Sequence, residues 1–170
     1  QTITVDTPLY RVKVSEKGAG FTSFILKNYR ETVQKDSPSK ELLPQENPIE
    51  TVLIGFDGKS LPGLDNAVFS TNLNADSIDV EAGSHKLTFS WKSSQGVVVE
   101  KTYSFAPDSY VIGLDVTVKN SSDRPIEDKR KPLGLGAGVF GGFAALAVIV
   151  LTTLVAGRLR WSDDLDGRVD

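Results

Sequence analysis

The sequence predicts a mainly β protein, in which an antiparallel β-sandwich is followed by a single transmembrane α-helix. Polar and apolar residues alternate with a period of two through most of the first 120 residues, which is typical of half-buried strands. Glycine, proline and aspartate turns separate these runs, and many short strands joined by turns favour a sandwich. An uncharged run of 25 residues, 133–157, then predicts a helix of about 37 Å, long enough to cross a hydrocarbon core of about 30 Å.

The clearest strand is expected at residues 110–119, where five alternate side chains share one apolar face. These are Tyr110, Ile112, Leu114, Val116 and Val118. Residues 87–91 and 97–105 predict a hairpin around a turn at 93–96, although Lys101 interrupts the apolar face of the second strand. Further strands are expected at residues 3–6, 9–15, 21–26, 51–56 and 68–71. The proline-containing stretch 34–48 is expected to be a surface loop.

These patterns divide the chain into four parts. We expect residues 1–126 to form the β-sandwich domain and residues 127–132 to form a charged juxtamembrane linker. We expect the transmembrane helix at residues 133–157 and a polar tail at residues 158–170. We expect charged and aromatic side chains at the membrane interfaces, namely Lys129, Arg130, Lys131, Arg158, Arg160 and Trp161. Glycines recur every four residues at Gly134, Gly138 and Gly142, a spacing that favours close packing against a second membrane helix.

The composition excludes several functions. A net charge of −3 gives no basis for nucleic-acid binding, and the absence of cysteine excludes disulfides, thiolate zinc sites and cysteine nucleophiles. The single histidine, His85, lies in a turn-like stretch and cannot build a multi-histidine metal site. The glycines at 136–141 match a dinucleotide fingerprint, but no strand precedes them. We therefore expect neither an enzyme nor a cofactor, and we expect Gln1 to be an interior or processed position because the chain has no methionine.

The soluble part resembles the large periplasmic domain of bacterial YidC-type membrane protein insertases. The resemblance rests on ITVDTPLY at 3–10, GAGFTSF at 18–24 and LKNYR at 26–30, followed by KTYSF at 101–105, DSY at 108–110 and VTVKN at 116–120. In this order and spacing the motifs cover about residues 1–126. Residues 127–170 resemble no part of that family.

The resemblance implies a β-supersandwich on the periplasmic side of the bacterial inner membrane. It implies contacts with the bilayer and with Sec translocon subunits or nascent membrane proteins, and a role in the insertion or folding of membrane proteins. In that family insertase activity resides in a bundle of membrane helices with a key arginine, whereas the run 133–157 carries no charge. We therefore expect an interaction or chaperone-like module that binds extended segments at its sheet edges.

Two other functions fit the sequence. Supersandwich folds also occur in sugar mutarotases, so a sugar-binding or mutarotase-like domain is one alternative, with His85 and either Glu100 or Glu81 as its acid–base pair. A purely structural single-pass membrane protein, associated through helix–helix contacts at Gly134, Gly138 and Gly142, is the other.

Overall fold

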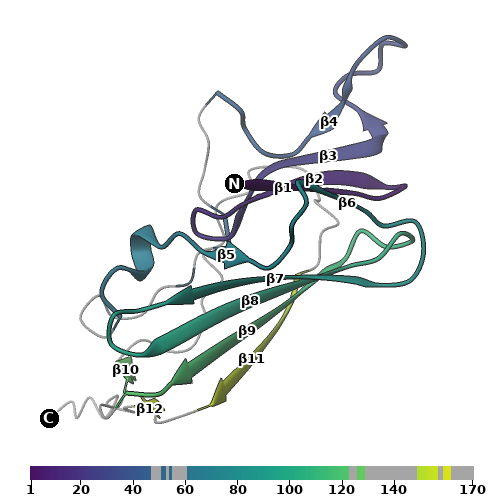
Figure 1. The fold of residues 1–170 in the computed structure, drawn as a ribbon. Helices are drawn as coiled ribbons and strands as arrows, with labels where there is room; N and C mark the ends of the chain where they lie inside the picture. Colours follow the sequence, from purple (N-terminus) through teal and green to yellow (C-terminus); the bar gives the residue numbers. More distant parts are fainter. Residues whose placement is uncertain are drawn as a thin grey trace, which may run out of the picture.

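Two five-stranded β-sheets make up most of the described part of the chain (Figure 1). The computed structural model describes residues 1–46, 51–52, 54 and 61–122, and the backbone of 126–128, 149–156 and 159–161. The first sheet contains, in spatial order, β4 (Ser39–Glu41), β3 (Gly20–Arg30), β2 (Tyr10–Ser15), β1 (Thr2–Asp6) and β6 (Ser77–Asp79). The second sheet contains β11 (Ile149–Ala156), β9 (Ile112–Asn120), β8 (Val97–Phe105), β7 (His85–Lys92) and β5 (Ser70–Thr71). A 3₁₀ turn, η1 (Leu64–Asn66), precedes β5, and β10 (Ile126–Asp128) pairs with β12 (Leu159–Trp161).

The predicted β class is confirmed, and most of the pairing is antiparallel. Consecutive strands β1–β2–β3–β4 and β7–β8–β9 pair antiparallel with their neighbours, as short connections require. Three pairs are parallel, namely β1 with β6, β9 with β11 and β10 with β12. Each of these parallel pairs joins strands that lie far apart in the sequence.

The predicted β7–β8 hairpin is confirmed around a turn that begins at Ser93. The Ser93 N–H donates to the Val97 carbonyl at 2.8 Å, and the Ser93 hydroxyl accepts the N–H groups of Gln95 and Val97. Gly96 has a φ of 85°, which a residue with a side chain rarely adopts. The serine and the glycine therefore close this turn.

Several strand boundaries differ from those predicted. Strand β3 extends to Arg30, four residues beyond the predicted end, and β5 contains only Ser70 and Thr71. Strand β4 lies inside the predicted loop 34–48, because it pairs with the long end of β3. Of the strand predicted at 51–56, residues 51, 52 and 54 are described and are not in a strand, while the others lie outside the described residues.

The C-terminal apolar run also differs from the prediction where it is described. Residues 149–156 form β11, paired in parallel along β9, at the position expected for the last part of the transmembrane helix. Five of these eight residues are β-branched, namely Ile149, Val150, Thr152, Thr153 and Val155, and such residues favour strands. Residues 133–148 and 157 lie outside the described residues. Within the described part of the chain, no helix is long and apolar enough to cross a bilayer.

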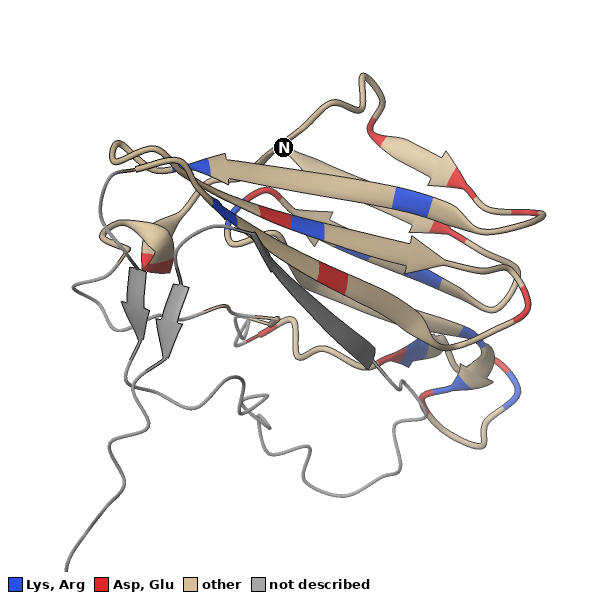
Figure 2. Cartoon of the chain, turned by 90° about the horizontal axis from the view of Figure 1, so that it is seen from below, with Lys and Arg blue, Asp and Glu red and all other residues tan. Residues whose placement is uncertain are grey.

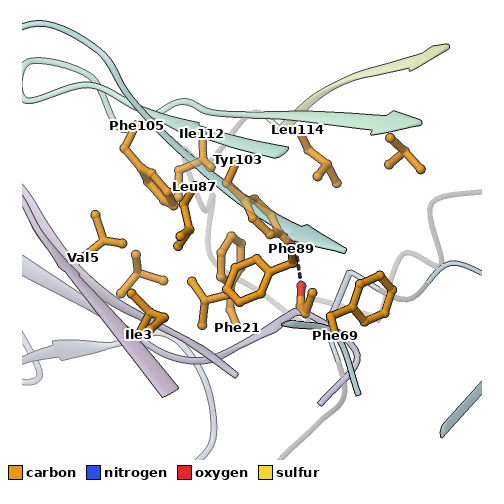
Figure 3. Packing of buried hydrophobic residues seen from close by; sticks show 14 of the residues in the cluster. Ile3, Val5, Phe21, Phe69, Leu87, Phe89, Tyr103, Phe105, Ile112 and Leu114 are labelled. Carbon is orange, nitrogen blue, oxygen red and sulfur yellow. Dashed lines mark hydrogen bonds between the residues drawn. The ribbon is translucent and has the colours of Figure 1, made fainter. Parts of the chain in front are cut away.

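The core lies between the two sheets and is filled by alternate side chains from both (Figure 3). From the first sheet come Ile3, Val5 and Phe21, and facing them from the second come Leu87, Phe89, Tyr103, Phe105, Ile112 and Leu114. The rings of Phe21 and Tyr103 lie 5.1 Å apart and join the two layers. Apolar burial on this scale is the main favourable term for folding.

Two polar side chains of β8, Lys101 and Tyr103, point into this core. The Lys101 ammonium donates to the carbonyls of Gly18 at 2.5 Å and Val52 at 2.7 Å, and lies 5.2 Å from the centre of the Phe69 ring. The Tyr103 hydroxyl donates to the Ala19 carbonyl at 2.5 Å. We call this set of contacts the polar node; it connects β8 of the second sheet to the turn between β2 and β3 of the first.

Burial controls the protonation of both polar side chains. Lys101 is only 1% exposed, and desolvation lowers its pKa to about 8. Burial also raises the pKa of Tyr103, so its phenol stays neutral and keeps its proton for the Ala19 carbonyl. Ala19 has a φ of 47°, a left-handed conformation that costs about 1 kcal/mol for a residue with a side chain. The polar node therefore holds the β2–β3 turn in a conformation that it would not favour alone.

A second buried tyrosine, Tyr10, offers a direct comparison. Tyr10 is fully buried, and among the described residues its hydroxyl has no hydrogen-bond partner. Burial raises its pKa to about 12. The ring packs against Phe24, with the two centres 5.2 Å apart. Its contribution is therefore apolar packing, whereas Tyr103 contributes both packing and a hydrogen bond.

Replacing each tyrosine by phenylalanine should separate these contributions. Tyr103→Phe should lower the free energy of unfolding by about 1–3 kcal/mol, because it leaves the buried Ala19 carbonyl without its donor. Tyr10→Phe should leave that free energy unchanged or raise it, because it removes an unpaired buried hydroxyl. Urea denaturation of the full chain measures both, and equal losses would contradict the role given to Tyr103.

Candidate interaction surfaces

Three of the four edges of the two described five-stranded sheets are short. Among the described strands, the first sheet ends at β4 and β6, with three residues each, and the second at β11 and at β5, with two residues. An edge strand presents unpaired N–H and C=O groups, which another extended chain can bind through backbone hydrogen bonds. The three shortest edges provide few such groups, so a partner strand would need additional side-chain contacts.

Residues 28–38 form a hairpin that projects from the body of the first sheet, and we call it the projecting hairpin (Figure 1). It is ordered by its own hydrogen bonds: the Glu31 N–H donates to the Pro38 carbonyl at 3.0 Å and the Thr32 N–H to the Ser37 hydroxyl at 2.9 Å. Val33 lies near its tip and is fully exposed. The projecting hairpin therefore carries an exposed apolar side chain near its tip.

Three tyrosine rings lead from the projecting hairpin into the core. Tyr29 is 53% exposed and its ring centre lies 6.2 Å from that of Tyr110, which in turn lies 6.3 Å from that of the buried Tyr10. We call these three residues the aromatic ladder. Val111, next to Tyr110, is 39% exposed. Tyrosines are enriched at protein interfaces, because the ring gives apolar contact area and the hydroxyl remains polar.

The charges on the described surface are mixed in sign. Figure 2 shows acidic and basic residues interspersed on the face that it displays. On the first sheet Asp6 forms ion pairs with Arg11 and Lys27. Partial burial raises the pKa of Asp6, but the hydrogen bonds from Lys27 and Arg11 outweigh this effect and hold the pKa below its ordinary value. Such paired charges favour a partner that is recognised by shape and apolar contact rather than by net charge.

Most of the predicted membrane residues lie outside the described residues. This applies to Lys129, Arg130, Lys131, Gly134, Gly138, Gly142 and Arg158. Arg160 and Trp161 lie in β12, of which only the backbone is described. Their roles at the membrane interface and in helix packing therefore remain predictions.

The structure separates His85 from Glu100, one of its two predicted acid–base partners. His85 pairs with Phe105 and Glu100 with Ser90, so the two lie five positions apart along β8, or about 17 Å at 3.4 Å per residue. The Glu100 carboxylate instead accepts a hydrogen bond from Lys119 at 2.8 Å. Glu81, like His85, is exposed. Within the described residues, no group of three or more histidine, aspartate or glutamate side chains could hold a metal ion.

The exposed positions of Tyr29 and Val33 were not predicted from the sequence. The signal available was weak: Tyr29 follows the last apolar alternation of β3, and Val33 is an isolated apolar residue between polar neighbours. If the predicted strand at 21–26 had been extended through Tyr29, the hairpin that follows it would have been predicted as well. The exposed position of Val33 depends on the hairpin geometry, which is not evident from residue order.

Comparison with known proteins places the chain in a family. The family model for the YidC periplasmic domain matches residues 2–130. The membrane protein insertase YidC of Syntrophus aciditrophicus is 34% identical over 130 residues, which cover 76% of this chain and 24% of the relative. The YidC of Geobacter sulfurreducens is 38% identical over 118 residues, covering 68% of this chain and 22% of the relative.

The chain thus spans about a quarter of the length of the curated relatives that it matches. The match includes both sheets from β1 to β9, and with them the polar node and the aromatic ladder. It ends at residue 130, before the apolar run. The chain belongs to the YidC family of membrane protein insertases, through the periplasmic domain of that family.

Proposed function

We propose that this chain assists the insertion or folding of membrane proteins through protein–protein contacts made by a β domain on the periplasmic side of the inner membrane. The match of residues 2–130 to the YidC periplasmic domain is the observation that carries the proposal. The relatives that share this domain are described as membrane protein insertases. Sugar chemistry is not proposed, because His85 and Glu100 lie far apart and both Glu81 and His85 are exposed to solvent.

The projecting hairpin and the aromatic ladder form the contact surface in this proposal. Segments of a membrane protein that have not yet reached lipid are apolar and carry few charges. Val33 and Tyr29 offer exposed apolar surface to such a segment, and Tyr110 extends that surface toward the core. The paired charges around Asp6 would not repel a neutral partner.

Backbone hydrogen bonds to a sheet edge would add to these contacts. Strand β4 forms the edge of the first sheet beside the projecting hairpin, so an extended segment that contacts Val33 can also reach this edge. Strand addition makes little demand on sequence, which suits a module that meets many different membrane proteins. Nascent membrane proteins and Sec translocon subunits are therefore the proposed partners.

A photocrosslinking amino acid at Val33 tests this surface in bacterial cells that express the full chain. Val68 is the matched control, because it too is an exposed valine, with 66% of its surface accessible. It lies just before β5, away from the projecting hairpin (Figure 1). We expect adducts with nascent membrane proteins or Sec subunits from position 33 and few from position 68. Adducts of equal yield from both positions, or none from position 33, would rule out the projecting hairpin as the contact surface.

Attachment to the membrane through residues 133–157 is the second part of the proposal. The uncharged run is long enough to span a bilayer, and Lys129 to Lys131 before it and Trp161 after it suit the two interfaces. Residues 149–156 can be shielded from water in two ways, either inside a bilayer or by pairing with strand β9. In the cell, we place these residues in the bilayer together with the rest of the run.

Paired cysteines can distinguish the two environments, because the chain has no cysteine of its own. Asp115 and Thr152 are register partners in β9 and β11, so Asp115→Cys with Thr152→Cys should oxidise readily if the strand forms. In lipid vesicles we expect this pair to stay reduced, while the control pair Lys92→Cys with Val98→Cys, across the β7–β8 hairpin, forms its disulfide. A disulfide between positions 115 and 152 in vesicles would refute the anchor.

A further inference from the structure

The segment Thr51–Val52 docks onto the first sheet through side-chain and carbonyl contacts. The Thr51 hydroxyl accepts the Phe21 N–H at 2.7 Å and donates to the Phe21 carbonyl at 2.9 Å, so one side chain satisfies both backbone groups of Phe21. The next carbonyl, that of Val52, accepts a hydrogen bond from the Lys101 ammonium. This segment thus covers the polar node from the side of the first sheet.

The docked arrangement is close and strained. A Cβ atom at Gly20 would lie 2.5 Å from the Thr51 carbonyl oxygen, so the segment approaches β3 where only glycine allows it. Val52 has a φ of 55°, a left-handed conformation that a β-branched residue rarely adopts. Strained conformations persist where surrounding contacts enforce them, and they concentrate in parts of proteins that move or bind.

Lys101 depends on this segment for its surroundings. Its ammonium has three donors, of which two are taken by the carbonyls of Gly18 and Val52, while the Phe69 ring lies on a further side. The side chain is almost completely buried. Release of the segment would remove the Val52 carbonyl and admit water to the amine.

We propose that the docking of Thr51–Val52 is linked to protonation through Lys101: the segment closes over a desolvated amine, and its release hydrates the amine and strengthens its hold on a proton. Acidification then favours release and alkaline conditions favour docking. This inference concerns the conformation of the domain and does not depend on the proposed function.

The direction follows from the two states of the amine. With the segment docked, burial lowers the pKa of Lys101 to about 8, whereas a hydrated lysine has a pKa of about 10.4. The released state therefore binds more protons between these two values, and the equilibrium shifts toward docking as the pH rises. Between pH 7 and pH 9 this linkage amounts to a shift of roughly tenfold.

The titratable groups near Lys101 come from β8 and from the stretch that leads to the turn between β2 and β3. Tyr103, on the same face of β8, stays neutral in this range because burial raises its pKa. In the stretch that leads to the turn, Glu16 is bonded to the N-terminal ammonium at 2.9 Å and Lys17 is exposed. The residues paired with Lys101 across β7 and β9 are Phe89 and Val116, which are apolar. Among the described residues, Tyr103 is the titratable group that faces Lys101.

Thr51→Ala tests the linkage, because it removes both hydrogen bonds to Phe21. In the full chain, NMR titration of the Lys101 side-chain Cε should give a midpoint near 8, and in Thr51→Ala the midpoint should rise toward the ordinary lysine value. The Phe21 amide should lose its protection against hydrogen exchange in the same variant. Thr88→Ala is the control: Thr88 bonds Thr102 at 2.9 Å on β7 and β8, and its loss should leave the Lys101 midpoint unchanged.

The wild-type chain supplies an independent measurement. Its Phe21 amide protection factor, corrected for the intrinsic exchange rate, should rise roughly tenfold between pH 7 and pH 9. Two results would overturn the proposal: a protection factor that does not change with pH, or an unprotected Phe21 amide in Thr51→Ala with an unshifted Lys101 midpoint. A Phe21 amide that stays protected in Thr51→Ala would also overturn it, because the segment would then not depend on the Thr51 contacts.

Discussion

The buried ammonium of Lys101 is the constraint on which the rest of the domain depends. A charged group almost fully removed from water is costly unless hydrogen bonds replace its hydration, and here two carbonyls and an aromatic ring take that role. Those carbonyls belong to Gly18 and Val52, which lie 83 and 49 residues from Lys101. With the neighbouring bond from Tyr103 to Ala19, the contacts fix how β8 lies against the first sheet.

The alternation of polar and apolar residues was sufficient to predict most of the fold. The alternation correctly predicted the strands β1, β2, β3, β7, β8 and β9. In each of these strands one face is buried and the other is not. The alternation failed for the strand β4, which is short and lies at an edge. The run 133–157 is uncharged throughout, so its pattern alone does not distinguish a helix from the strand that residues 149–156 form.

The candidate functional features were less predictable, because they depend on contacts between distant residues. Lys101 appeared in the sequence only as an interruption of an apolar face, and its partners could not be found from spacing. The exposure of Tyr29 and Val33 follows from the length of β3 and the hairpin that it forms with β4. The family resemblance is confirmed, since the model of the YidC periplasmic domain matches residues 2–130.

The pH dependence of stability tests the central claim, that a desolvated amine at position 101 joins the two sheets. The free energy of unfolding of the full chain would be measured by urea denaturation at pH 7 and pH 9, with Lys101→Met as the reference. Because the unfolded chain binds more protons than the folded chain in this range, the wild type should gain about 1.4 kcal/mol relative to the reference as the pH rises. A wild type that gains nothing, or loses stability, relative to Lys101→Met would show that the amine is solvated and that the sheets are joined in another way.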